Sequence, residues 1–378
     1  MKFSKLALAV TTALACSAAL ADITIGVSLS ATGPAASLGI PEKNAFTLLP
    51  TEIGGEKVKL VVLDDATDPT VATKNARRLV SEDKVDAIIG SSSTPATAAM
   101  AEVAHESKTP LVTMSPAALP AERNEWVFRA PQQNGVMSSA LVEHMKAKGV
   151  KTLGFIGFSD AYGEDWLNAV TKQAEAAGIK LSVVERYNRA DTSVTGQVLK
   201  LVSSKPDAIL VVGSGSPAAL PQSALVERGY KGQIYQTHAA ANQAFLSVAG
   251  KAAEGVIMPV GPVSVVDQLP DSHLSKKSGV DFVKKYEAQF GAGSFSAFAG
   301  YAHDAYRLIE AAVPAAKAKG KPGTPEFRAA LRSAIEASKE VVGVHGVFNM
   351  TPADHFGLDA RSRVLVRIEG GTYKLVSQ

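Results

Sequence analysis

The sequence predicts an α/β fold with two doubly wound lobes, each a parallel sheet covered by helices on both faces. In the first half of the chain, short apolar runs such as 58–63 alternate with helical stretches such as 70–81 across short polar connections. This alternation is typical of parallel sheets, and it restarts near residue 138. A length of 378 residues suits two domains of ordinary size better than one.

The first 21 residues predict a cleavable export signal. Lys2 and Lys5 precede an apolar run over 6–15, and small residues then lead to Ala21, as at a signal-peptide cleavage site. The apolar run is too short to span a bilayer. Because Cys16, the only cysteine, lies in this segment, the mature chain would have no disulfide. The alternative is a lipoprotein with Cys16 lipidated.

Strands and helices are expected in strict order along both halves. Asp68 and Pro69 open one helix as a cap followed by proline. The first half predicts strands at 23–30, 58–63, 87–89 and 110–114, and helices at 43–49, 70–81 and 96–104. The second half predicts strands at 152–158, 181–184, 208–212 and 233–236, with helices at 138–148, up to 178, at 194–203 and up to 228. Beyond an irregular stretch at 261–277, helices are expected at 280–290, 302–318 and 325–339, and strands at 346–348, 363–368 and 372–376.

Four hydroxyl side chains follow the strand that ends at Gly90. A buried strand, a tight turn and a helix N-terminus would direct these hydroxyls and several backbone N–H groups toward one point, which suits an anion such as a carboxylate. An ordinary helix cap is the simpler alternative. Other predicted strand ends also carry polar groups, and ligands of such sheets bind there. The hydroxyls and strand-end groups are Ser91, Ser92, Ser93, Thr94, Ser115, Tyr162, Ser214, Ser216 and His238.

Several classes of function are disfavoured by what the sequence lacks. With a formal net charge of +3 and no basic block, nucleic acid is not an expected partner. The turn after Gly90 lacks the second glycine of a nucleophile elbow. No phosphate-binding loop or complete dinucleotide fingerprint occurs, and the histidines show no metal-ligand spacing. We therefore expect a non-enzymatic protein without cofactor or metal. The enzymatic alternative is a hydrolase that uses Ser91 and His238, without a visible orienting acid.

Six short motifs, taken together, resemble the periplasmic solute-binding proteins of ABC importers, in the branch of the leucine/isoleucine/valine-binding protein. They are IGVSLSATGP at 25–34, LDDATDP at 63–69, IGSSST at 89–94, PLVTMSP at 110–116, DAYGE at 160–164 and AEGV at 253–256. The resemblance covers essentially the whole mature chain. It implies a periplasmic, monomeric protein that works with an ABC permease in the inner membrane.

The resemblance also implies a type I periplasmic-binding fold, with two lobes joined by a three-strand hinge. The crossings would fall near 129–131, 261–264 and 345–349. The implied division is a signal peptide at 1–21, a first lobe at 22–130 and 264–346, and a second lobe at 131–263 and 347–378.

In amino-acid-binding members, the residue that matches Ser91 holds the ligand carboxylate, together with the loop at Ser115. The carbonyl at the position of Ala117 receives the ligand ammonium, and a tyrosine matching Tyr162 also contributes. Two departures occur here. Leu119 stands where a threonine is usual, and Thr237 with His238 stands where an acid pairs with the ammonium.

A buried ammonium without a counter-carboxylate is costly, so these departures favour a ligand without an α-ammonium. His238 or Thr237 would then donate to a carboxylic acid. Some members of the family bind benzoate-type aromatic acids, and the Gln-Thr-His run resembles that branch. Leu38 and Phe298, with Tyr301, would lie over the ligand, with simple core packing as the alternative.

The preferred interpretation is a periplasmic binding protein that delivers a small carboxylate, preferably an aromatic acid, to its permease. One alternative keeps the transporter and makes the ligand a branched-chain amino acid, with Asp160 or Glu164 reaching its ammonium. Another is a ligand-sensing subunit without transport.

Overall fold

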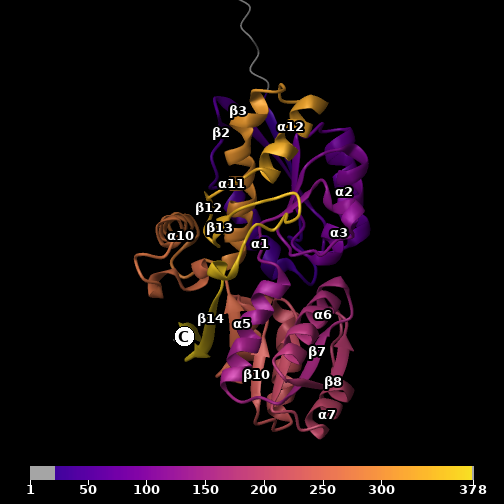
Figure 1. Cartoon of the computed structure of the whole chain (residues 1–378), viewed down its shortest axis with the longest axis vertical. Coiled ribbons are helices and arrows are strands. Elements are labelled where there is room, and N and C mark those ends of the chain that lie inside the picture. Colours follow the sequence, from indigo (N-terminus) through magenta and orange to yellow (C-terminus); the bar gives the residue numbers. More distant parts are fainter. Residues whose placement is uncertain (1–21, 377–378) are drawn as a thin grey trace, which may run out of the picture.

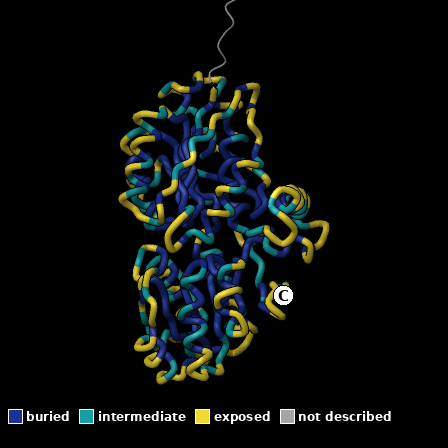
Figure 2. The backbone as a smooth tube through the Cα atoms, turned by 180° about the vertical axis from the view of Figure 1, so that it is seen from behind, coloured by how far each residue is buried: buried dark blue, intermediate teal, exposed yellow. Residues whose placement is uncertain are grey.

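The computed structural model describes residues 22–376 and shows two α/β lobes, one above the other in Figure 1. The predicted signal peptide and Cys16 lie outside these residues. Apolar side chains fill the interior of both lobes, and exposed residues lie on the outer loops, on helix faces and on the edge strands (Figure 2). The predicted fold class, two doubly wound lobes with mostly parallel sheets, is confirmed.

The first lobe has a sheet with the strand order β2-β3-β1-β4-β5-β6. All neighbours are parallel except β2, which is antiparallel to β3. The strands are β1 (Ile23–Leu29), β2 (Glu52–Ile53), β3 (Glu56–Asp64), β4 (Ala87–Gly90), β5 (Leu111–Thr113) and β6 (Val127–Arg129). Its helices are α1 (Ala36–Phe46), α2 (Pro69–Ser81), α3 (Thr94–Ser107), α4 (Ala121–Asn124), α10 (Lys276–Phe290), α11 (Ala297–Lys317) and α12 (Pro325–Glu336).

The second lobe has a sheet with the order β15-β14-β11-β10-β9-β7-β8. Its core is parallel, and β14 and β15 add an antiparallel edge. The strands are β7 (Thr152–Phe158), β8 (Lys180–Tyr187), β9 (Ala208–Val212), β10 (Gln233–Gln236), β11 (Ile257–Val260), β14 (Val364–Glu369) and β15 (Thr372–Leu375). Its helices are α5 (Asn134–Ala147), α6 (Ala161–Ala176), α7 (Thr195–Ser203), α8 (Ala219–Glu227) and α9 (Gln243–Ala249), with the 3₁₀ turns η1 (Ser216–Ala218), η2 (His238–Ala240), η3 (Gly250–Ala253) and η5 (Ala360–Ser362).

Two elements differ from the sequence expectation for identifiable reasons. Strand β11 was not expected, because Pro259 removes a ladder donor and argues against an interior strand; β11 nevertheless pairs with both β10 and β14. Helix α1 begins at Ala36 rather than 43, with Pro41 inside it. The segment from 262 onward, expected to be irregular, contains the 3₁₀ turn η4 (Pro262–Gln268) before α10.

Three connections run between the lobes and lie against one another. The first follows Arg129 and the second follows Val260. The side-chain amide of Gln132 on the first connection donates to the carbonyl of Ser362, 2.7 Å away, on the third. A Cβ at Gly261 would lie 1.9 Å from Nδ1 of His345, so only glycine lets the second connection pass this close to the third.

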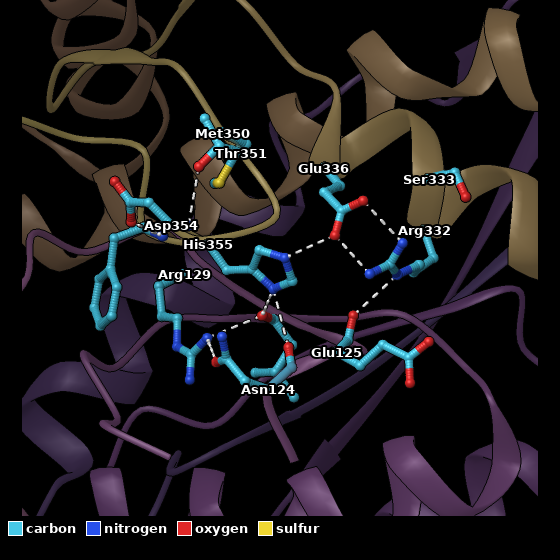
Figure 3. Close-up of polar contacts among 12 residues, drawn as sticks. Asn124, Glu125, Arg129, Arg332, Ser333, Glu336, Met350, Thr351, Asp354 and His355 are labelled. Atoms are coloured by element: carbon cyan, nitrogen blue, oxygen red, sulfur yellow. Dashed lines mark hydrogen bonds and ion pairs between the residues drawn. The ribbon is translucent and has the colours of Figure 1, made fainter. Parts of the chain in front are cut away.

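The third connection leaves the first lobe later than expected. Strand β13 (Val347–Phe348) pairs with β12 (Val341–Val342), and the chain then continues along the first lobe. His355 stacks on Phe128 with ring centroids 4.4 Å apart, and its ring nitrogens contact Asn124 and Glu336 (Figure 3). The first lobe therefore extends beyond the predicted boundary after residue 346, because this loop buries its imidazole there before β14 joins the second sheet.

The buried carboxylate of Asp304 on α11 holds the beginning of this third connection. It accepts the backbone N–H groups of Val344 at 2.8 Å and His345 at 2.9 Å, and it is fully buried. We expect Asp304→Ala to lower the free energy of unfolding by about 2–5 kcal/mol, because two buried donors lose their acceptor. Urea denaturation measures this loss.

Glu310→Ala on the same helix is the matched control, since Glu310 forms only a partly exposed pair with Arg307. Its loss should stay within about 1 kcal/mol. Equal losses in the two variants would contradict the role assigned to Asp304.

Candidate functional site

A narrow cavity with about 20 Å³ of free space lies between the lobes. Both lobes and the connections contribute to its wall. The lining residues are Leu38, Ser92, Ser93, Thr94, Met114, Ser115, Pro116, Pro131, Tyr162, Arg189, Ser214, His238, Ala239, Phe298 and Tyr301. Of the residues predicted from the sequence, the cavity brings together Leu38, Ser92, Ser93, Ser115, Tyr162, Ser214, His238 and Phe298.

The turn after β4 reaches the cavity because it passes very close to β1. A Cβ at Gly90 would lie 1.9 Å from the carbonyl oxygen of Ser28, at a φ of +138°, so this position requires glycine. The N-terminus of α3 follows at Thr94. The hydroxyl of Ser93 is buried and has no hydrogen-bond partner among the described residues, which leaves it available to a bound molecule.

Ser91, predicted to hold the ligand carboxylate, is not part of the cavity wall. Its hydroxyl donates to Asp65 at 2.7 Å, and its N–H donates to the hydroxyl of Thr97 at 2.9 Å. The hydroxyl of Ser91 lies away from the cavity because the buried carboxylate of Asp65, at the end of β3, accepts its hydrogen bond. The hydrolase alternative requires a pair between Ser91 and His238. The structure does not form this pair, because the hydroxyl of Ser91 donates to Asp65.

Asp65 binds four donors from three segments. They are the hydroxyls of Ser28, Ser30 and Ser91, and the N–H of Thr67. Burial raises the pKa of Asp65, and the hydrogen bonds from Ser91 and Ser30 oppose the change. This carboxylate therefore fixes the turn whose next residues face the cavity.

Ala117 and Thr237 also lie outside the cavity wall. The carbonyl of Ala117 accepts from Nε of Arg129 at 3.1 Å, so a guanidinium already lies where a ligand ammonium was expected. The hydroxyl of Thr237 donates to the carbonyl of Gly213 at 3.1 Å and accepts from Tyr162 at 2.9 Å. Thr237 thus holds the ring of Tyr162 rather than facing a ligand.

Arg189 is the cationic group of the cavity wall, and sequence reasoning missed it. Its Nε donates to Asp160 at 2.6 Å and its Nη1 donates to Ser214 at 2.9 Å. The guanidinium also lies 4.2 Å from the ring centroid of Phe158. Arg189 follows the carboxyl end of β8, so the strand-end rule could have found it. The strand was expected to end at 184, and β8 continues to Tyr187.

His238 faces the cavity as a neutral imidazole. Burial lowers its pKa to about 3, and His345 adds to the change. Its Nδ1 is buried without a hydrogen-bond partner among the described residues, and its ring lies 6.0 Å from that of Trp166. A neutral histidine can present one donor and one acceptor, so it can bind a carboxyl group without adding charge.

Phe298 and Tyr301 close the cavity from α11. Their rings lie 5.8 Å apart in an edge-on arrangement. The hydroxyl of Tyr301 donates to Gln132 at 3.1 Å, and its ring stacks on His345 at 4.0 Å. These aromatic residues both line the cavity and pack against the connections between the lobes.

Two further features are absent from residues 22–376, namely a cluster of metal ligands and a membrane-spanning helix. This part of the chain holds no group of three or more histidine, cysteine or acidic side chains suited to a metal ion. None of its helices combines the length and the apolar character needed to cross a lipid bilayer.

Comparisons with known proteins agree with the fold. An extracellular ligand-binding receptor from Rhodopseudomonas palustris is 50% identical, with a TM-score of 0.93 over 95% of this chain and 100% of its own. An amino acid binding protein from Pseudomonas aeruginosa is 28% identical over 68% of this chain and 72% of its own length. An R. palustris solute-binding protein in complex with benzoate is 22% identical and shares the fold, with a TM-score of 0.75 over 94% of this chain and 95% of its own.

The family profile described as periplasmic binding protein matches residues 22–371. This match spans nearly all of the described residues, and the relatives named above are binding proteins rather than enzymes. The resemblance found in the sequence is thereby confirmed, and the chain belongs to the periplasmic binding protein family.

Proposed function

We propose that the protein is the periplasmic substrate-binding component of an ABC transporter, and that it delivers a small carboxylate, preferably a benzoate-type acid, to the membrane permease. The observation that supports this most strongly is the charge of the cavity wall. Among the described residues that line it, Arg189 is positive and no aspartate or glutamate is present. Such a wall favours a buried anion and disfavours a buried ammonium.

The remaining wall suits the apolar body of an aromatic acid. Leu38, Met114, Pro116 and Phe298 present apolar surface, and Tyr301 adds the face of an aromatic ring. Aromatic ligands gain both from the area they bury and from ring contacts. The hydroxyls of Ser92, Ser93 and Thr94 face the same cavity from the opposite lobe to Arg189, so a carboxylate could be bound from both sides.

The alternative ligand is a branched-chain amino acid, which the 28% identical amino acid binding protein favours. It requires an acid for the ammonium, and the two predicted candidates are already engaged. Asp160 accepts from Arg189 and caps α6 through the N–H of Tyr162, and Glu164 pairs with Arg186. The benzoate complex is too distant in sequence to decide the ligand, so the choice rests on the cavity wall.

A calorimetric panel of benzoate, 3,4-dihydroxybenzoate, leucine, isoleucine and valine tests the ligand class. We expect the aromatic acids to bind at least about 100-fold more tightly than leucine, because an unpaired buried ammonium costs several kcal/mol. Tight binding of leucine without a response to either benzoate would show that the aromatic assignment is wrong.

Replacement of Arg189 tests the role of its charge. Arg189→Met should weaken benzoate binding about 10- to 100-fold, the range for loss of a hydrogen bond to a charged group. Benzamide has the same ring without the negative charge, so its binding should change little. Isothermal titration calorimetry with both compounds separates loss of charge recognition from loss of cavity shape.

Arg186→Met is the matched control, because Arg186 forms an exposed pair with Glu164 outside the cavity wall. It should bind benzoate like the unmodified protein. If Arg189→Met weakened benzoate and benzamide equally, the guanidinium would be a structural element rather than a ligand-binding one.

A further inference from the structure

Glu42 on α1 is a buried acid directly behind the cavity wall. It is fully buried, and the one side-chain hydrogen bond that it makes among the described residues joins Oε2 to the hydroxyl of Ser92, a lining residue. Its Oε1 has no hydrogen-bond partner within the described part of the chain. An ionised carboxylate normally binds several donors when it is buried, so this environment suits the neutral acid.

The charge nearest to Glu42 also favours its neutral form. The carboxylate of Asp65 repels a negative charge on Glu42. An ionised Glu42 would in turn raise the pKa of the Tyr301 phenol on α11. Burial, reinforced by Asp65 and opposed by the hydrogen bond from Ser92, raises the pKa of Glu42 well above its usual range.

The protonation state of Glu42 decides what Ser92 can offer to a ligand. The Ser92 oxygen already accepts the N–H of Ser30 at 3.0 Å. If Glu42 is ionised, the single hydroxyl hydrogen of Ser92 points to Glu42, and Ser92 can offer the cavity only its one remaining lone pair, with a negative charge behind it. If Glu42 is neutral, it donates its own hydrogen to Ser92, and the Ser92 hydrogen is free to point into the cavity.

Resting on the proposed function, we propose that Glu42 is a positioning residue whose proton makes Ser92 a donor to the ligand, so that the cavity accepts a carboxylate only while Glu42 is neutral. When Glu42 ionises, its proton leaves to solvent and the Ser92 hydrogen turns away from the cavity. When an anion binds to the ionised form, one proton must be taken up at Glu42. Anion binding is therefore linked to pH through this residue.

The test measures benzoate affinity by calorimetry from about pH 5 up to the highest pH at which the protein stays folded, because burial raises the pKa of a carboxyl group. The unmodified protein should lose affinity as pH rises through the pKa of Glu42, by up to tenfold per pH unit. Glu42→Gln should bind as tightly as the unmodified protein at low pH and keep that affinity at high pH, because the glutamine amide also donates to Ser92. Identical pH profiles, or a folded glutamine variant with at least tenfold weaker binding, would overturn the proposal.

Glu336→Gln is the matched control, because it also removes one carboxylate, a partly buried one, from the first lobe. Glu336 pairs with Arg332 and His355 (Figure 3) and does not line the cavity. Its pH profile should match that of the unmodified protein, and a profile as flat as that of Glu42→Gln would overturn the assignment. Ser92→Ala gives an independent readout, since it should weaken binding at low pH and reduce the dependence on pH.

Infrared spectroscopy of the ligand-free protein separates this proposal from the ligand assignment. A protonated-carboxyl absorption at neutral pH should be present in the unmodified protein and absent from Glu42→Gln. If no acid of the panel binds, the proposed function fails, and the infrared result still decides whether Glu42 holds a proton. Absence of that absorption would overturn the inference even if benzoate binds.

Discussion

The hydrogen bonds around Asp65 are the interaction on which the site depends. This carboxylate follows β3 and binds hydroxyls from β1, from the loop beyond it and from the turn after β4. It thereby ties together the carboxyl ends of three adjacent strands. With Ser91 committed to Asp65, the next two serines are left to face the cavity and the buried acid of α1.

The two lobes present different chemical groups to the cavity. The first lobe presents hydroxyl groups and the start of a helix, none of which carries a formal charge. The second lobe presents a guanidinium whose position is set by Asp160 and Ser214. A carboxylate held between them would meet a cation on one side and uncharged donors on the other. Each lobe alone would bind it weakly, which favours closure around the ligand.

The fold could be predicted from the sequence, and so could most of the residues that line the candidate cavity, because both depend on local patterns. Alternating apolar and helical segments predict parallel sheets, and polar strand ends predict where a ligand binds. Which serine faces the ligand could not be predicted, since that depends on the contact between Ser91 and Asp65 across 26 residues. The acidic pair at 64–65 gives no sign of this role in the sequence, because a strand end that leads into a capped helix accounts for it. Arg189 was missed because β8 extends further than its apolar pattern. Strand β11 was missed because the proline within it argues against a strand.

The late return of the chain to the second lobe has a consequence for how the molecule is assembled. Strand β11 has β14 as its antiparallel neighbour, and more than a hundred residues of first-lobe structure separate the two in sequence. While the polypeptide is still emerging, one edge of the second sheet stays uncovered until residues 364–375 are available. The lobe that begins to form second in the chain is thus also the last to be completed, and unpaired strand edges of this kind are where association between unfinished chains starts.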